Sequence, residues 1–490
     1  MPATLKTRAF PGYINTASQF DPFIDPGELS KTGPPIGYHM ETRQPIFFNP
    51  WEEKVKGNIA ATIFGIIGEK GTGKSAFNKI LLRRLMSMQA GLDKYGIPRQ
   101  MTAEINDRKR EQGVPEYEKV TTNLEGEVIS LNQKGMINVF DPAMGMTQTD
   151  VFETAVNIHE TVSGLPLVDS QSLALQIAVW RMFTEFKDVA CPEILSALLR
   201  GMTPQDRSNF YAYQNENEIY AISERLEEFP ELGEKLRRLH QIADQNQGAR
   251  DYDLINDAAK VEMQLSRMLG GDYGKIIGGT RSLRETLSST VCTLDWTGVP
   301  EKARTLILSI FWKWREVAVN NNDNDIIAGL RFNDEMHEVF QSLMGMRFLS
   351  AYVKKARAVR TAEFITTQYE TDYLMGGDKD SQIRDLGEGI LRGISAWFIF
   401  GHPNADEAVK QRLAARGLSK ADIKFIIELP RGCVCIKMGT RPAIFMQVVP
   451  TLTERDLIRT EGASEGMMET VPYTENPEIM ERARQAGLIA

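Results

Sequence analysis

The feature that most constrains the fold is a glycine-rich segment between an apolar run and an amphipathic pattern. Residues 68–75 read Gly-Glu-Lys-Gly-Thr-Gly-Lys-Ser, which fits the pattern G-x-x-x-x-G-K-[ST]. Residues 61–67 are almost continuously apolar, as in a strand that is buried on both faces. After the segment, apolar residues recur at helical spacing with basic residues between them. Strand, loop and helix in this order predict a loop whose backbone N–H groups surround phosphate, and therefore a nucleoside triphosphate site.

Each residue type in this segment has an expected role. The glycines let the backbone close around the β-phosphate, Lys74 reaches the β- and γ-phosphates, and the Ser75 hydroxyl holds Mg²⁺. The alternative, a glycine turn that only resembles the motif, does not account for the strand and helix patterns on either side. We expect ATP and Mg²⁺ to contact Gly68, Glu69, Lys70, Gly71, Thr72, Gly73, Lys74, Ser75 and Ala76.

Composition excludes several classes of protein. The 490 residues carry a net charge of −8, which argues against a protein that coats DNA through a general positive charge. Four cysteines in this length do not form a disulfide framework, so we expect a reducing cytoplasm and interpret Cys433 and Cys435 as core residues. No apolar run approaches the roughly 20 residues that span a bilayer. We therefore expect a cytoplasmic protein without a transmembrane segment, for which peripheral docking at the membrane stays open.

The pattern of apolar segments divides the chain into parts. Residues 1–57 suggest short lead-in strands, and residues 451–490 form an acidic tail of mixed composition. Between them, strand-like runs alternate with helical patterns, which predicts a mainly parallel sheet with helices on both faces. Residues 151–284 instead show long helical patterns with many charges, so we predict a helical insertion that divides the α/β domain into 58–150 and 285–450. The expected strands cover 61–67, 100–107, 127–131, 136–142, 289–296, 326–332, 362–367, 394–400 and a hairpin in 432–449.

A carboxylate pair follows one of these strands. Asp334 and Glu335 come directly after the run 326–332, where we expect Asp334 to hold Mg²⁺ and Glu335 to polarise the attacking water as general base. The alternative is an exposed acidic helix start, which the phosphate-binding segment upstream makes the weaker interpretation. Gln368 ends the next strand, where its amide either senses the γ-phosphate or is satisfied by a turn.

Phosphoryl transfer gains from a positive charge that arrives in the transition state. In the sequence, the set of Lys74, Ser75, Asp334 and Glu335 contains no cation besides Lys74. We therefore expect an arginine from a neighbouring subunit to complete the site. Arg360 and Arg392 flank the Gln368 strand and are the candidates, although a charged helix face is usually only solvated surface.

The order of these segments resembles the ATPase domain of the VirB/TraC/TrbE-type conjugation and type IV secretion ATPases, in the HerA/FtsK branch of RecA-like motors. The resemblance extends from about residue 34 to 450, with Met336 in the metal box where that family has alanine. Family members usually carry a substantial amino-terminal domain ahead of the motor, so we expect a separate partner to supply that part here. The matching segments are Pro35–Tyr38, Gly68–Ser75, Met136–Pro142, Cys292–Gly298, Asn333–His337, Thr366–Gln368 and Gly417–Gly432.

The resemblance implies an α/β fold of the RecA-like P-loop NTPase type and an ATP hydrolase that powers DNA or protein translocation or channel assembly. It also implies a homo-oligomer, a hexamer with ATP at subunit boundaries, and type IV secretion channel proteins at the inner face of the membrane as partners. Two alternatives stay open. One is a DNA-pumping translocase of the HerA/FtsK kind outside a secretion system, and the other is an assembly ATPase whose nucleotide state sets partner binding.

Overall fold

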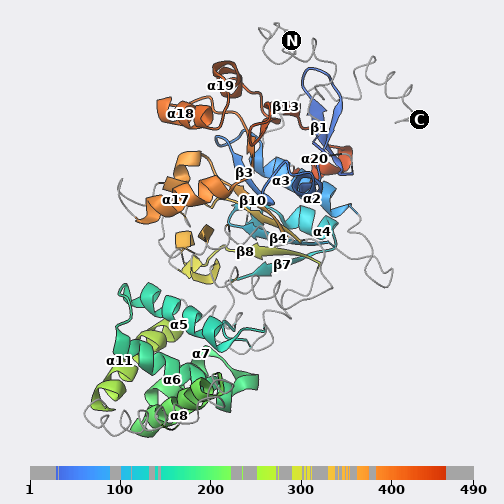
Figure 1. Ribbon diagram of the computed structural model, residues 1–490. Helices are drawn as coiled ribbons and strands as arrows, with labels where there is room; N and C mark the ends of the chain where they lie inside the picture. Colours follow the sequence, from blue (N-terminus) through green and yellow to red (C-terminus); the bar gives the residue numbers. More distant parts are fainter. Residues whose placement is uncertain are drawn as a thin grey trace.

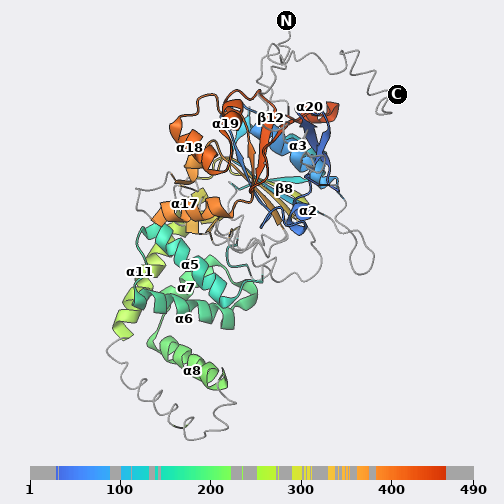
Figure 2. The ribbon, with the colours of Figure 1, turned by 45° about the horizontal axis from the view of Figure 1, so that its top comes forward.

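Figure 1 shows the computed structural model, in which an α/β part holds the sheet and a separate group of helices lies beyond one sheet edge. Figure 2 shows the same two parts from a second direction. With short gaps inside these ranges, the structure describes residues 29–88, 101–131, 138–141, 145–221, 251–271, 290–311, 329–336, 345–353, 361–374 and 382–458, together with the single residues 234, 274 and 340.

One large sheet organises the α/β part. All neighbouring strands from β11 to β7 are parallel, whereas β12, β13, β1 and β2 extend the sheet antiparallel at its other end. A separate two-stranded ribbon consists of β5 (Arg110–Glu111) and β6 (Val114–Pro115). The large sheet has the order β2 (Pro45–Phe47), β1 (Pro35–His39), β13 (Ile444–Gln447), β12 (Cys433–Met438), β11 (Ala396–Ile399), β3 (Ile63–Ile67), β10 (Thr361–Thr366), β9 (Gly329–Asn333), β4 (Thr102–Asp107), β8 (Val291–Asp295) and β7 (Glu127–Ser130).

Helices cover both faces of this sheet, as the sequence predicts. On one face, α3 (Lys74–Met86) packs its apolar side against Phe64 and Phe398. On the other face, α17 (Gln382–Gly393) packs with Trp397 and Ile399. Among the residues that the structure describes, the α/β part also contains α2 (Pro50–Val55), α4 (Glu118–Asn123), η3 (Glu370–Leu374), α18 (Glu407–Ala415), α19 (Lys420–Ile427) and α20 (Leu452–Ile458).

A row of aromatic rings fixes the register of the central strands. Phe364 of β10 lies opposite Phe64 of β3 and Phe332 of β9. Its ring stacks on both, with centroid distances of 5.0 Å to Phe64 and 4.5 Å to Phe332. Because a slip of one residue would move these rings to the opposite face, the row specifies how the ends of β3, β9 and β10 align.

The separate helical group leaves the sheet after β7 and returns to it at β8. Its first helix begins with a capping box, in which Thr147 and Asp150 exchange hydrogen bonds with the backbone. The buried apolar residues of α6 form the centre of this group. Within the described part of the chain, the group contains α5 (Gln148–Ser163), α6 (Asp169–Glu185), η2 (Lys187–Val189), α7 (Pro192–Arg200), α8 (Pro204–Ala221) and α11 (Asp251–Gly270).

The strand predicted over 136–142 is wrong in its described part, because residues 138–141 form a turn. The Asn138 side chain accepts a hydrogen bond from the Phe140 backbone N–H at 3.1 Å and donates one to the Ala190 carbonyl at 2.7 Å. An asparagine that bonds the backbone two residues ahead replaces a strand ladder with a turn. Its second bond ties this turn to the helical group.

The carboxyl-terminal segment begins with a packed helix, and residues 459–490 lie outside the described residues. Glu454 of α20 is almost fully buried and accepts hydrogen bonds from Arg84 of α3 at 2.8 and 2.7 Å. Cys433 and Cys435 are buried on one face of β12 with their thiols unpaired, as expected of core residues. Burial raises the pKa of the Cys433 thiol to about 11.

Candidate active site

The segment 68–75, here called the phosphate loop, connects β3 to the helix α3 at the carboxyl edge of the parallel strands. Gly68 has φ of +155°, and a Cβ there would lie 2.5 Å from the Phe400 Cβ, so only glycine fits. Gly73, with φ of +109°, is the N-cap of α3 and offers no side chain to cap it. The first turn of α3 therefore presents its backbone N–H groups to the loop, as an anion site requires.

The loop is held between the ends of β10 and β11, the two strands that flank β3 in the sheet. Gly68 N–H donates to the carbonyl of Gln368, which follows β10, at 3.0 Å. Glu69 N–H donates to the carbonyl of Gly401, which follows β11, at 3.1 Å. The Glu69 carboxylate is buried and accepts hydrogen bonds from the Asn404 backbone N–H at 2.6 Å and from its amide at 2.5 Å. Sequence order alone did not reveal this contact with Asn404.

Lys74 is buried, with 8% of its surface exposed. Its ammonium donates to the carbonyl of Gly68 and, at 3.0 Å, to the carbonyl of Glu69. Burial lowers the Lys74 pKa, although the charges of Asp334 and Glu335 act in the opposite direction. An ammonium held by two loop carbonyls lies where phosphate oxygens can replace those carbonyls.

Asp334 and the phosphate loop meet through Ser75. The Ser75 hydroxyl donates to Asp334 Oδ2 at 3.1 Å, and the buried Tyr117 hydroxyl donates to the same oxygen at 3.0 Å. Burial raises the pKa of Asp334, and the charge of Glu116 adds to this. A hydroxyl and a carboxylate are the oxygen ligands that Mg²⁺ takes, and a cation here would offset the crowded negative charge. The donor set therefore fits Mg²⁺ held by Ser75 and Asp334.

Glu335 has a strained backbone. Its φ is +52°, which costs a residue with a side chain roughly 1–2 kcal/mol. Its N–H donates to Asp334 Oδ1 at 3.0 Å, and its carbonyl accepts from Arg108 Nη1 at 3.4 Å. The Glu335 carboxylate forms an ion pair with Lys109. Such strain is typical of residues whose position serves function.

The expectation that this set contains no cation besides Lys74 is wrong, because the structure adds Lys109. Lys109 follows β4, far from residue 335 in the chain, so no local sequence pattern connects the two residues. The sheet order makes β4 the neighbour of β9, so the residues after the two strands meet. Tyr117, from the same connection after β4, reaches Asp334 for the same reason.

Asp107 holds the connection after β4 in place. Its two carboxylate oxygens accept from Lys109 N–H at 3.0 Å and from Tyr117 N–H at 2.9 Å. Burial raises the pKa of Asp107 to about 7. The charges of Glu116 and Asp334 also raise this pKa, whereas the two hydrogen bonds lower it. Asp107 thus positions both Lys109 and Tyr117.

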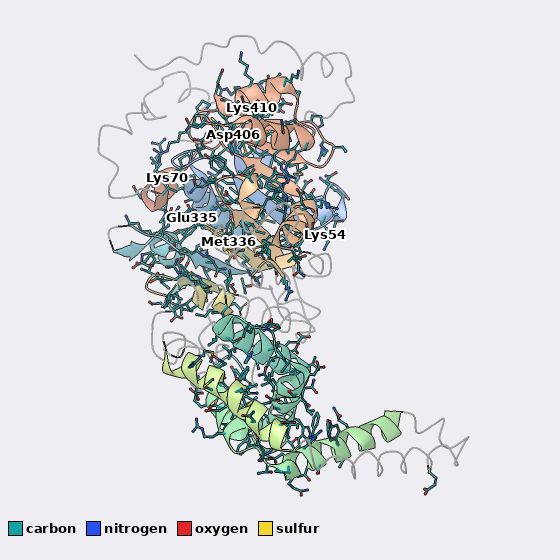
Figure 3. The ribbon with its side chains drawn as sticks, turned by 90° about the vertical axis from the view of Figure 1, so that its left-hand side faces the viewer. Lys54, Lys70, Glu335, Met336, Asp406 and Lys410 are labelled. Atoms are coloured by element: carbon teal, nitrogen blue, oxygen red, sulfur yellow. The ribbon has the colours of Figure 1, made fainter. Side chains whose placement is uncertain are left out.

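The other predicted site residues lie in the phosphate loop, beside it or on α17. Thr72 closes the loop by donating to the Glu69 carbonyl at 2.7 Å, while Lys70 and Gly71 are exposed and Ala76 lies in the first turn of α3. Figure 3 labels Lys70, Glu335 and Asp406 in the α/β part. Gln368 flanks the loop through its backbone carbonyl. Arg392 is exposed near the end of α17, and Arg360 lies outside the described residues.

Comparisons with known proteins show similarity in fold to solved structures. No protein-family model matches this chain, and no curated protein matches it in sequence. The structure of VirB4 of Thermoanaerobacter pseudethanolicus superimposes with a TM-score of 0.59 at 15% identity, covering 87% of this chain and 98% of that one. The bacterial conjugative coupling protein TrwBdeltaN70, in its trigonal form with sulphate, gives a TM-score of 0.50 at 11% identity, covering 86% and 90%. The predicted resemblance to conjugation ATPases is thus confirmed at the level of the fold, which is an α/β fold with a mostly parallel sheet.

Proposed function

We propose that this protein is a P-loop ATP hydrolase. The observation that carries the proposal is the hydrogen bond of 3.1 Å between the Ser75 hydroxyl and Asp334 Oδ2. It joins a loop shaped for phosphate to a buried carboxylate, with a second carboxylate, Glu335, next in the chain. Phosphate cradle, metal ligands and general base are the parts that hydrolysis of a nucleoside triphosphate requires.

In the proposed reaction, the phosphate loop and Lys74 bind the β- and γ-phosphates. Mg²⁺, held by Ser75 and Asp334, would neutralise negative charge on the phosphate oxygens. Glu335 orients a water molecule and accepts its proton as the water oxygen bonds to the γ-phosphorus. The bond from the γ-phosphorus to the bridging oxygen breaks, and its electron pair stays on the β-phosphate of ADP. The products are ADP and inorganic phosphate.

For the biological role, we propose that hydrolysis powers DNA or protein translocation, or channel assembly, in conjugative transfer. The support is the fold shared with VirB4 and with a protein named as a conjugative coupling protein. None of the helices that the structure describes is long and apolar enough to cross a bilayer. We propose a hexamer that works in the cytoplasm at the inner face of the membrane, against channel proteins that supply the membrane-spanning part.

The test is ATP turnover by purified protein, measured alone, with single-stranded DNA, with double-stranded DNA and with a channel protein of a type IV secretion system. The proposal predicts turnover in the wild type and none in Lys74→Ala at equal concentration. Stimulation by either DNA supports DNA translocation, whereas stimulation only by a channel protein supports protein transfer or assembly. Wild-type protein without ATP turnover under all of these conditions would contradict the proposal.

A further inference from the structure

We propose that Lys109 is a catalytic residue that acts in its own subunit. When ATP binds, the Lys109 ammonium moves away from the Glu335 carboxylate and contacts the γ-phosphate. The inference rests on the proposed function and names a cation that serves the same site. The Lys109 Nζ atom forms an ion pair with Glu335 Oε1. The positive charge of this ammonium favours the deprotonated carboxylate, so Glu335 is a weaker proton acceptor while the pair is formed. The pair therefore describes a resting arrangement of the base.

The two partners of the ion pair differ in exposure. The Lys109 side chain is 42% exposed, and the Glu335 side chain is 12% exposed. Because the lysine end of the pair is exposed, water screens the pair, and the ammonium can leave the carboxylate when a stronger partner arrives. A γ-phosphate next to the site is such a partner, because it carries more negative charge and several acceptor oxygens. The long lysine stem can pivot from the carboxylate to the phosphate while the glutamate stays in place.

The backbone of Lys109 is held by hydrogen bonds, although its side chain is exposed. Its N–H donates to the Asp107 carboxylate at 3.0 Å, and its carbonyl accepts from Glu116 N–H at 3.1 Å. The strand before it is tied to the carboxylate pair, because Asp334 N–H donates to the Asn106 carbonyl at 3.3 Å. A fixed backbone with a flexible cation at its end is what a residue needs to reach an incoming phosphate reproducibly.

Electrostatics place Lys109 in the same cluster as the loop lysine. Burial alone would lower the Lys109 pKa, but Asp334 and Glu335 outweigh it and raise the pKa. The charge of Lys109 also contributes to the lowering of the Lys74 pKa, so the two ammonium groups act on each other. Lys109 therefore stays protonated and delivers a full positive charge where the transferred phosphoryl group develops negative charge.

Arg108, its neighbour, serves a different purpose. Its guanidinium lies over the Trp296 ring, with the central carbon 5.9 Å from the ring centroid. It also donates to the Glu335 carbonyl, which helps to hold the strained backbone at that residue. We assign Arg108 as a positioning residue and Lys109 as the cation that moves.

The first test compares Lys109→Met with Lys109→Arg and with Lys119→Met. Lys119 is an exposed lysine of α4 on the same connection and serves as the matched control. We expect Lys109→Met to lower kcat roughly 10²–10³-fold, as loss of one transition-state donor does, while ATP affinity changes only a few-fold. It should also weaken binding of ADP with aluminium fluoride, a transition-state mimic, more than binding of ADP alone. Lys109→Arg should recover part of the rate, and Lys119→Met should match the wild type.

The second test mixes inactive subunits. If Lys109 acts in its own subunit, each active site needs Lys74 and Lys109 from the same chain. Every site in a mixture of Lys109→Met and Lys74→Ala then lacks one of the two lysines, so the mixture should recover no turnover. Recovery in the mixture would show that Lys109 acts across a boundary and would overturn the inference. Turnover by Lys109→Met within threefold of the wild type, or equal loss of ADP and ADP–aluminium fluoride binding, would overturn it as well. Wild-type protein without any ATP turnover would remove the proposed function and this inference with it.

Discussion

Ser75 and Asp334 are 259 residues apart in the chain, yet the hydroxyl of one donates to the carboxylate of the other at 3.1 Å. The contact forms because β3, β10 and β9 are parallel neighbours whose carboxyl ends share one edge of the sheet. A phosphate loop after β3 and a carboxylate pair after β9 are thereby brought together.

Lys74→Ala should weaken ATP binding at least about tenfold and abolish turnover. Lys74 contacts two loop carbonyls and no apolar core, so the protein should stay folded. Binding of a fluorescent ATP analogue and the thermal unfolding midpoint check both parts. A well-folded variant with wild-type affinity and turnover would show that the loop does not bind phosphate through Lys74.

Asp334→Asn should remove the dependence of nucleotide affinity on Mg²⁺. The amide keeps the size of the side chain but loses the charge that a divalent cation requires. Affinity for ATP should be measured with Mg²⁺ and with a chelator for the wild type and the variant. If Mg²⁺ strengthened binding equally in both proteins, Asp334 would not be a metal ligand.

The contribution of Asp107 to stability should fall between about pH 4 and pH 7, because burial raises the pKa of this carboxyl group to about 7. A carboxyl group with a raised pKa in the folded state stabilises the protein below its unfolded pKa, and this contribution is lost as pH rises through the folded pKa. The slope from this one group is at most about 1.4 kcal/mol per pH unit. Urea unfolding at several pH values gives the free energy of unfolding of the wild type and of Asp107→Asn. The difference between the two should change with pH by this slope.

The trans arginine stays a prediction. Arg360→Ala or Arg392→Ala, if inactive alone, should recover some turnover when mixed with Lys74→Ala, because each subunit then supplies what the other lacks. Phosphate release should be followed over a range of mixing ratios, together with the mass of the assembly. Full activity in a dilute monomer, with no recovery at any ratio, would exclude a shared site.

The sequence allowed the phosphate loop, the Asp334–Glu335 pair and the parallel sheet to be predicted, because each depends on a local pattern of apolar runs and polar strand ends. The cations after β4 could not be predicted in the same way. Lys109 and Arg108 reach Glu335 only because β4 lies beside β9, and that adjacency depends on the order of strands in the sheet. The turn at Asn138 was missed because its side-chain hydrogen bonds override the apolar pattern around it.

The most direct test of the account is the rate of phosphate release from ATP by Glu335→Gln, measured at saturating ATP with nucleotide occupancy determined in parallel. The amide preserves the shape of the side chain but cannot accept a proton from water. The account predicts wild-type occupancy with turnover lowered roughly 10²–10⁴-fold. An unchanged rate in a fully occupied Glu335→Gln protein would contradict the role of Glu335 as the base and the site built around it.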